Sequence, residues 1–478
     1  MPRNVTAQIV SADFDPKGLE VIRLSGREAM NTPYLFDVDV AVKGTTGPTI
    51  ADLLGRAMVL AFTEGDSAER VIAGIVAEAE ESYSSETAVR TLRLHIVPRL
   101  FRLTQIRLTE KYAGTLSEII EKKLNDCDVP FETLFSTTYA DPAGTFVAQH
   151  FETDLDFLNR RCEHYGIAYY FQTGSNGDCV FISDDNRFLD RRADLVVPFQ
   201  ARGERKDVYA LTARGRMAPT KYLVSDYNYQ APSVDLVGET DLATGTGGGV
   251  VEYGANVKTQ EDASLLSRVR AEEQAAQQFV FRGESDRPEL QAGLVFKLEG
   301  HPTLGDLELL VTEVEHSVQQ PALRTGDGGL AYSNHFKAIP ASVAFRPARV
   351  TPVPRISGLM SGIVLSRPDG AADRPWLDEF GRYRIQLMCE LFDLSGRQRN
   401  TRSMRMLQAS AGAGYGIHFP LRPGTEVMLA YVNGDPDRPL IVGAVPNQVT
   451  PSPVTDTEPL YNRISTSSGI FLEMEDSD

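Results

Sequence analysis

Short stretches in which apolar and polar residues alternate are the feature that most limits what this chain can fold into. The clearest covers residues 34–43, Y-L-F-D-V-D-V-A-V-K, and places its aromatic and branched apolar side chains on one face. A period of two residues is that of a strand with one buried face. Similar runs, joined by acidic or glycine-containing turns, occur at 58–62, 71–79 and 92–97. This rhythm predicts antiparallel sheets and barrels rather than alternating strands and helices.

Three helices are expected to interrupt these strands. Thr115 with Glu118 has the spacing of a capping box, and Thr153 with Asp156 repeats it. The helix that follows Thr153 is expected to end at Gly166. A third helix, at about 261–278, carries an apolar stripe. The first two thirds of the chain are therefore predicted to be mainly β with an α+β arrangement.

A proline-rich segment marks the end of this region. The segment A-F-R-P-A-R-V-T-P-V-P-R, residues 344–355, contains three prolines, which lack the N–H group that a helix or sheet needs. We therefore predict the following division of the chain: an N-terminal region at 1–345 with an insert around 100–200, a linker at 346–356, a barrel at 357–447, and a further linker and strand start at 448–478.

Five short strands without a long helix between them are predicted after this linker. They are placed at 357–365, 381–388, 404–408, 424–432 and 440–445. This pattern predicts a small closed β-barrel of the OB-fold type.

The charge and cysteine content exclude several classes of protein. The 478 residues carry a formal net charge of −17, which argues against nucleic acid or an anionic membrane as the main partner. Four cysteines without C-x-x-C spacing indicate reduced thiols. We find neither a secretory signal pattern nor a run of 18 or more apolar residues, and so expect a protein that is kept in solution in the cytoplasm.

No motif in the sequence assembles a convincing active site. G-D-S-A at 65–68 resembles a nucleophile block but is better explained as a hairpin turn. The glycine runs at 245–249 and 412–416 are not followed by Lys-Ser/Thr and are read as connections. The neighbouring carboxylates Asp154 and Asp156, Asp184 and Asp185, and Glu272 and Glu273 are read as structural, and Cys162 and His164 do not share a helix face. We therefore assign no catalytic, cofactor-binding or metal-binding residue and no cofactor.

The most distinctive motif near the C-terminus is Y-V-N-G-D-P-D-R-P-L-I-V-G-A-V, residues 431–445. Gly434, Asp435 and Pro436 favour a turn, and apolar runs lie on both sides. We predict a corner between two strands, braced by Asp435, Asp437 and Arg438. The strand before it is apolar on both faces, which suggests that one face meets a neighbouring subunit.

Motifs in a fixed order give the chain a family resemblance. They are L-S-G-R-E-A-M-N-T-P-Y-L-F-D-V-D-V at 24–40, F-E-T-D-L-D-F-L-N-R-R-C-E-H-Y-G-I-A-Y-Y-F at 151–171, F-R-G-E-S-D at 281–286, L-E-G-H-P at 298–302, D-E-F-G-R-Y-R-I-Q-L at 378–387 and R-P-G-T-E-V-M-L-A-Y-V-N-G-D-P-D-R-P-L-I-V-G at 422–443. With these motifs the chain resembles the VgrG family, the spike proteins of type VI secretion systems, which is related to the hub and spike of contractile phage tails.

The resemblance implies a structural, non-enzymatic homotrimer. Residues 1–345 would form a phage-hub-like region whose tube-like β-barrel domains, with helical insertions, dock on a hexameric Hcp-type tube, and an OB-fold domain and a β-helical needle would follow. Further implied partners are a PAAR-type tip protein, baseplate proteins and effector proteins or their adaptors, with secretion by contraction into a target cell or the medium. The same hub also fits an extracellular contractile injection particle or a phage-like tail, and, less well, a cell-wall hydrolase.

Two features depart from the family pattern. M-C-E-L-F-D at 388–393 and T-R-S-M-R-M-L at 401–407 replace segments that relatives commonly fill with F-P-W-D-like and S-C-W-V-R-V-like sequences. Only some thirty residues follow the barrel, and I-F-L-E-M-E-D at 470–476 resembles the first strand of a needle. Either the chain continues beyond residue 478 or its spike is minimal.

Overall fold

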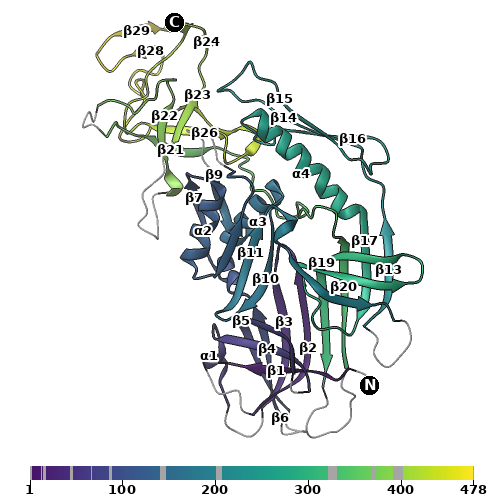
Figure 1. The fold of residues 1–478 in the computed structure, drawn as a ribbon. Helices are drawn as coiled ribbons and strands as arrows, with labels where there is room; N and C mark the ends of the chain where they lie inside the picture. The colour runs from purple at the N-terminus through teal and green to yellow at the C-terminus, as the bar shows by residue number, and fades with distance from the viewer. Residues whose placement is uncertain are drawn as a thin grey trace. The chain divides into compact units, whose positions relative to one another are not determined.

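The computed structural model describes residues 3–11, 13, 18–42, 47–65, 67–84, 89–139, 147–200, 207–320, 331–368, 373–390 and 402–476 (Figure 1). The chain divides into two compact units. The first contains 1–107, 114–140 and 153–353, and the second contains 108–113, 141–152 and 354–478. Asp66, 391–401 and 477–478, on which parts of the sequence predictions fall, lie outside the described residues.

The N-terminal strands form the first half of a twelve-stranded sheet in the first unit. In the order of the sheet they are β1 (Val5–Val10), β4 (Ala57–Glu64), β5 (Ser67–Ser84), β6 (Val89–Val97), β3 (Thr32–Val42) and β2 (Leu19–Ala29). The alternation in β3 is confirmed, because Tyr34, Phe36 and Val38 are buried. β1 also contacts β2, so this first strand group curls towards closure.

Six later strands form the second half of the same sheet. Their order is β13 (Val208–Gly215), β17 (Phe279–Ser285), β20 (Ala331–Pro340), β19 (Gly305–Gln319), β18 (Leu294–His301) and β12 (Asp190–Pro198). A bridge between Phe199 and Val208 connects the ends of β12 and β13, so this second strand group also curls on itself. The long β19 pairs with β18 in its first half and with β2 in its second half, and so joins the two groups (Figure 1).

Both strand groups use one packing device. Gly26 in β2 lies opposite Phe36 in β3, and Gly283 in β17 lies opposite Phe336 in β20. In each case the phenylalanine ring covers the glycine, since a Cβ atom added to the glycine would lie 2.0 Å from Phe36 Cδ1 or 2.2 Å from Phe336 Cζ. Each phenylalanine belongs to a separate buried cluster, so each group has its own core.

The predicted helices are confirmed, and their caps explain where they begin and end. α2 (Leu116–Asp126) has the Thr115–Glu118 capping box. α3 (Asp154–Tyr165) is capped by Thr153 and ends at Gly166, whose φ of 71° is left-handed. The same part of the chain forms the three-stranded sheet of β10 (Ala168–Gly174), β11 (Gly177–Ser183) and β8 (Phe131–Leu134). The first unit also contains the short helices α1 (Ile50–Leu53), η1 (Arg99–Gln105) and η2 (Asn186–Phe188).

The third helix belongs to a separate layer of the first unit. α4 (Gln260–Gln278) packs on the three-stranded sheet of β15 (Leu236–Asp241), β14 (Lys221–Asp226) and β16 (Gly249–Tyr253). The predicted glycine connection at 245–249 joins β15 to β16, with positive φ at Gly247 and Gly248. It does not open a helix.

The second unit contains the predicted OB-type barrel. Its strands, in the order in which the barrel closes, are β21 (Met360–Val364), β22 (Tyr383–Leu387), β23 (Arg402–Met406), β27 (Pro439–Ala444) and β26 (Glu426–Tyr431). The remaining elements are the pairs β7 (Arg107–Tyr112) with β9 (Val147–Thr153), β24 (Ala411–Gly412) with β25 (Tyr415–Gly416) and β28 (Tyr461–Ser465) with β29 (Phe471–Glu475), and the short helices η3 (Met388–Glu390) and η4 (Val432–Gly434). Within the described ranges, no helix has the length and apolar character needed to cross a membrane.

The glycine–phenylalanine device generates a stability prediction. Gly26→Ala and Gly283→Ala should each lower the free energy of unfolding by about 1–3 kcal/mol, because the added methyl group must displace a buried ring. Gly174→Ala is the matched control, since nothing lies within 4 Å of its Cβ position. Urea unfolding of the three variants is the measurement. Equal stability of the Gly26 and Gly174 variants would contradict the packing described.

Candidate functional site

A buried polar cluster joins the two strand groups. Glu28 of β2, Arg70 of β5 and His316 of β19 form it, with side-chain exposures of 7%, 8% and 0%. Glu28 Oε1 lies 2.7 Å from His316 Nε2, and Arg70 donates a hydrogen bond to the other oxygen of Glu28. Arg70 Nη1 also donates to the backbone oxygen of Leu290, 3.1 Å away, ahead of β18. The cluster therefore ties the first strand group to the second.

The charge states in this cluster follow from its surroundings. Burial alone would raise the pKa of Glu28, but the Arg70 guanidinium and the hydrogen bond with His316 outweigh it and lower the pKa to about 2. Burial lowers the pKa of His316, against the opposing effect of Glu28. At neutral pH the cluster thus holds one carboxylate, one guanidinium and a neutral imidazole. A second imidazole contact, Nδ1 to the Tyr332 hydroxyl at 2.8 Å, satisfies the other ring nitrogen.

The opposite face of the sheet carries a row of ion pairs that crosses both strand groups. Its pairs are Asp39–Arg93 at 2.8 Å, Asp37–His95 at 2.7 Å, Arg27–Glu313 at 3.1 Å, Lys337–Glu313 at 2.7 Å and His335–Glu284 at 4.0 Å. Partly exposed pairs of this kind each contribute little to stability. They make this face polar, which suits contact with water or with a polar partner rather than burial in a subunit core.

The motif at 431–445 forms the predicted corner. η4 lies between β26 and β27, and Asn433 and Gly434 have left-handed φ values of 57° and 71°. Asp435 braces the turn by accepting a hydrogen bond from the Asp437 N–H at 2.9 Å. Asp437 has a further role that its neighbours in sequence do not predict. Its Oδ1 accepts a hydrogen bond from the backbone N–H of Ala148, 2.6 Å away. The corner thus fastens β9 to the barrel.

The neighbouring carboxylates bind different partners. Asp154 pairs with Lys123 at 2.6 Å in a buried site, while Asp156 accepts a hydrogen bond from the Thr153 hydroxyl. The members of the other two pairs also have separate partners: Asp184 binds Ser136 and Tyr139, Asp185 binds Arg187, Glu272 binds Arg346 and Glu273 binds Arg349. Cys162 is fully buried. Among the described residues, no group of three or more His, Cys, Asp or Glu side chains could hold a metal ion.

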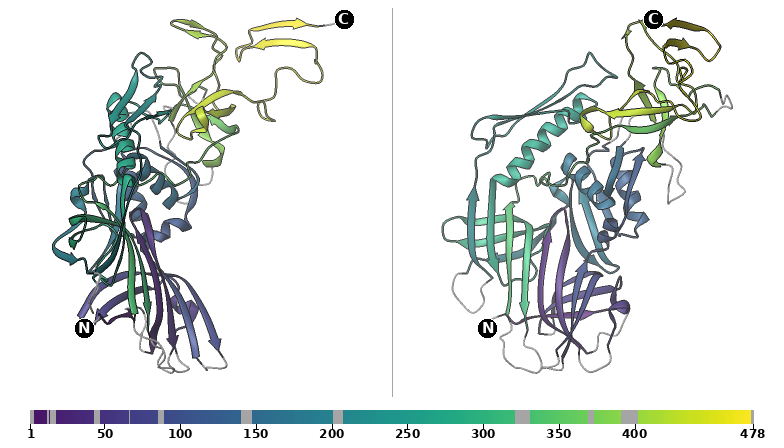
Figure 2. Two further views of the ribbon diagram at one scale, coloured as in Figure 1. Left: turned by 90° about the vertical axis from the view of Figure 1, so that its right-hand side faces the viewer. Right: turned by 180° about the vertical axis from the view of Figure 1, so that it is seen from behind.

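The hairpin of β28 and β29 exposes apolar side chains on both faces. Ile464, Phe471, Leu472 and Met474 are 48–66% exposed. Figure 2 shows the hairpin in yellow as two strands without a third beside them. A lone two-stranded hairpin is at best marginally stable in water. Its apolar side chains and open strand edges are therefore suited to association with further strands.

The buried cluster generates a pH-dependent prediction. Glu28→Gln should lower the free energy of unfolding by about 3–5 kcal/mol near neutral pH, because Arg70 is left in the core without its carboxylate. The pKa of Glu28 falls from 4.5 to about 2 on folding, so its stabilising effect is present above pH 4.5 and is lost as the pH falls towards 2.

The difference in free energy of unfolding between the natural chain and Glu28→Gln should therefore become smaller as the pH is lowered from 4.5 towards 2, as measured by urea titration. Glu313→Gln, on the polar face, is the control and should cost about 1 kcal/mol or less. If Glu28→Gln lowers the free energy of unfolding by the same amount at every pH, the charge of the Glu28 carboxylate does not stabilise the contact between the two strand groups.

Two family profiles match the chain. The phage tail baseplate hub (GPD) profile matches residues 27–322, and the type VI secretion system/phage-baseplate injector OB domain profile matches residues 377–445. The second match contains four of the five barrel strands, all but β21, and the first contains Glu28, Arg70 and His316, which join the strand groups.

Individual relatives point to the same group of proteins. The type VI secretion system spike protein VgrG1b of Pseudomonas aeruginosa is 27% identical over 448 residues, which are 90% of this chain and 59% of that protein. The actin cross-linking toxin VgrG1 of Vibrio cholerae is 27% identical over 380 residues, 76% of this chain and 34% of the toxin. The chain spans about three fifths of the length of VgrG1b and of its relative VgrG4b.

Solved structures share the fold. The Escherichia coli c3393 protein, a type VI secretion component described as similar to the T4 tail proteins gp27 and gp5, has a TM-score of 0.66 at 22% identity, covering 92% of this chain and all of that one. A chain of the Francisella PdpA–VgrG complex, half-lidded, has a TM-score of 0.62 at 8% identity, covering 99% of this chain and 83% of that one. Since the hub profile alone matches more than half of its length, the chain belongs to the phage tail baseplate hub (GPD) family.

Proposed function

We propose that this chain is the hub and spike subunit of a type VI secretion apparatus, that it acts as a homotrimer, and that its strand groups dock on a hexameric Hcp-type tube. The observation that carries the proposal is the repetition within one chain. Two six-stranded groups share the Gly26–Phe36 and Gly283–Phe336 device and are joined through β19. Three chains supply six such groups, which is the number that a hexameric tube presents.

The exposed hairpin supports the threefold part of the proposal. β28 and β29 offer apolar side chains on both faces and two open edges. Two further copies of the same segment would bring identical strands and cover these side chains in a closed, symmetric arrangement. This segment would then begin a needle that punctures the target membrane and accepts a PAAR-type tip protein and effectors or their adaptors.

A mechanical role fits the buried polar groups of the hub. These groups lie in structural pairs, such as Lys123–Asp154 and the Glu28 cluster. In this role the protein is pushed out of the cytoplasm by contraction after docking on the tube and baseplate. The hub of an extracellular injection particle or phage-like tail is the second candidate, since the matching OB-domain profile describes both type VI secretion systems and phage baseplates.

Sedimentation in solution tests the assembly. The 478-residue chain of 52.6 kDa should sediment as a species of three times that mass. Leu472→Asp, which places a charge on the exposed apolar hairpin, should weaken trimerisation about tenfold or more. Ser468→Asp adds the same charge in the hairpin turn and is the matched control. A natural chain that stays monomeric at every concentration would contradict the proposal.

A further inference from the structure

The sheet of β14, β15 and β16 is covered unevenly by α4. Gly238 in β15 lets the helix approach closely, since a Cβ atom there would lie 2.0 Å from the backbone oxygen of Ala263. Thr240 of β15 and Ser267 of α4 are also joined by a 2.9 Å hydrogen bond. At the other side of the sheet, the long side chain of Arg270 spans from α4 to Glu252 of β16, with Nε 2.9 Å from Oε2. The helix thus packs on β15 and leaves the inner face of β16 open.

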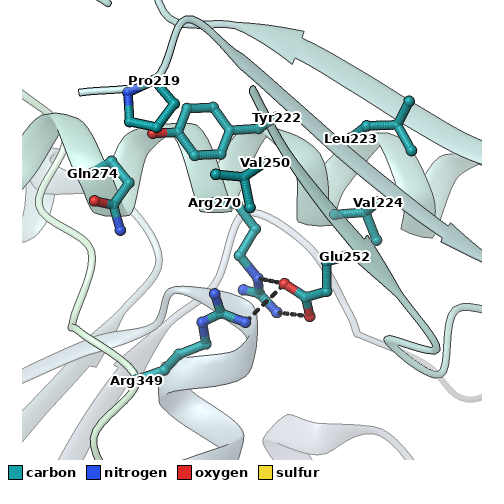
Figure 3. A pocket seen from close by; sticks show the side chains of 9 residues that line it. All are labelled: Pro219, Tyr222, Leu223, Val224, Val250, Glu252, Arg270, Gln274 and Arg349. Carbon is teal, nitrogen blue, oxygen red and sulfur yellow. Dashed lines mark hydrogen bonds and ion pairs between the residues drawn. The ribbon is translucent and has the colours of Figure 1, made fainter. Parts of the chain in front are cut away.

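A pocket occupies this open space. It has a volume of about 150 Å³ and is lined by Pro219, Tyr222, Leu223, Val224, Val250, Glu252, Arg270, Gln274 and Arg349 (Figure 3). Such a volume suits one side chain rather than a whole small molecule, because typical ligand sites are several hundred Å³.

Two hydrogen-bond donors in the pocket are unused. The hydroxyl of Tyr222 is buried, with the residue 3% exposed, and has no hydrogen-bond partner among the described residues. Arg349 donates from Nη1 to Glu252 at 2.8 Å and from Nε to Glu273 at 3.1 Å, while its Nη2 group bonds to no described residue. Gln274 Oε1 already accepts a bond from Arg216. A bound group with a hydrogen-bond acceptor could accept from both donors. A carboxylate is the strongest such acceptor beside a guanidinium.

The strand beside the pocket has a free edge. Within the described parts of the chain, β16 pairs with β14 and with no other strand. The Gly254 N–H bonds back to the Ser225 oxygen, so the alternation of the ladder directs the N–H groups of Val251 and Tyr253 outwards. These two residues are 71% and 68% exposed. An apolar edge strand without lysine or proline is ready to accept another strand.

We propose that the edge of β16 binds an extended segment of a partner protein by β-sheet addition, and that a glutamate of this segment enters the pocket beside Arg349 and Tyr222. Alternate side chains of an added strand point to opposite faces. The glutamate would therefore face the pocket, while apolar neighbours would lie next to Val251 and Tyr253 on the outer face. Backbone hydrogen bonds supply affinity in this mode, and the pocket supplies selectivity. The proposal does not depend on trimerisation or tube docking.

A labelled peptide tests the mode of binding. The probe is Ac-KVTVEVTVK-NH2 with a fluorophore, titrated with the full chain and followed by fluorescence anisotropy. We expect saturable binding, about tenfold weaker binding when the central glutamate is glutamine, and none with a scrambled peptide of the same composition. Absence of saturable binding up to about 1 mM, or equal binding of the glutamine peptide, would overturn the proposal.

Variants of the chain locate the site. Val251→Pro removes an outward N–H at an edge position where proline is tolerated, so the fold should remain and peptide binding should be lost. Val251→Thr keeps the N–H and should bind as the natural chain does. Tyr222→Phe removes only the unused hydroxyl and should weaken binding about tenfold.

Two outcomes with these variants would overturn the proposal. The first is undiminished peptide binding by a folded Val251→Pro variant, as judged by circular dichroism. The second is a change in the sedimentation of Val251→Pro in the absence of peptide, which would show that the edge of β16 is covered by another copy of this chain rather than by a different protein.

Discussion

The contact on which the hub depends is the buried pairing of Glu28 with Arg70 and His316. These side chains come from β2, β5 and β19, and Arg70 also holds the backbone at Leu290. A buried ion pair adds little net stability compared with apolar packing, because both charges lose their hydration. Its value here is geometric, since the contacts of Glu28 with Arg70 and His316 form only when the two strand groups meet in one register. The joint therefore turns two separate cores into one body with a fixed arrangement.

This arrangement gives the protein surfaces of two kinds. The sheet face that carries Arg27, Glu313 and Lys337 is covered with ion pairs across both strand groups and stays polar. Apolar side chains are instead exposed on the hairpin around Leu472 and at the edge strand around Val251. The proposed functions follow this division: the hairpin associates with copies of itself, the edge strand binds a foreign segment, and the paired strand groups repeat around an axis.

Local features of the sequence predicted much of the fold. The alternation at 34–43, the caps at Thr115 and Thr153 and the turn residues around Gly434 act over a few residues, so they can be read directly. Contacts between distant segments, such as β19 with β2 or Asp437 with Ala148, could not be predicted. No local pattern specifies a partner hundreds of residues away. The pocket beside β16 was missed for the same reason, because it combines residues from 219 to 349. Ordered motifs, rather than chemistry, indicated the family.

The central claim is that each chain contributes two equivalent strand groups to a threefold assembly. Electron microscopy of the purified 478-residue chain, with class averages viewed along the particle axis and no symmetry imposed, measures this number. We expect a ring of six similar densities with threefold symmetry. Single-chain particles, or rings with any other number of subunits, would contradict it.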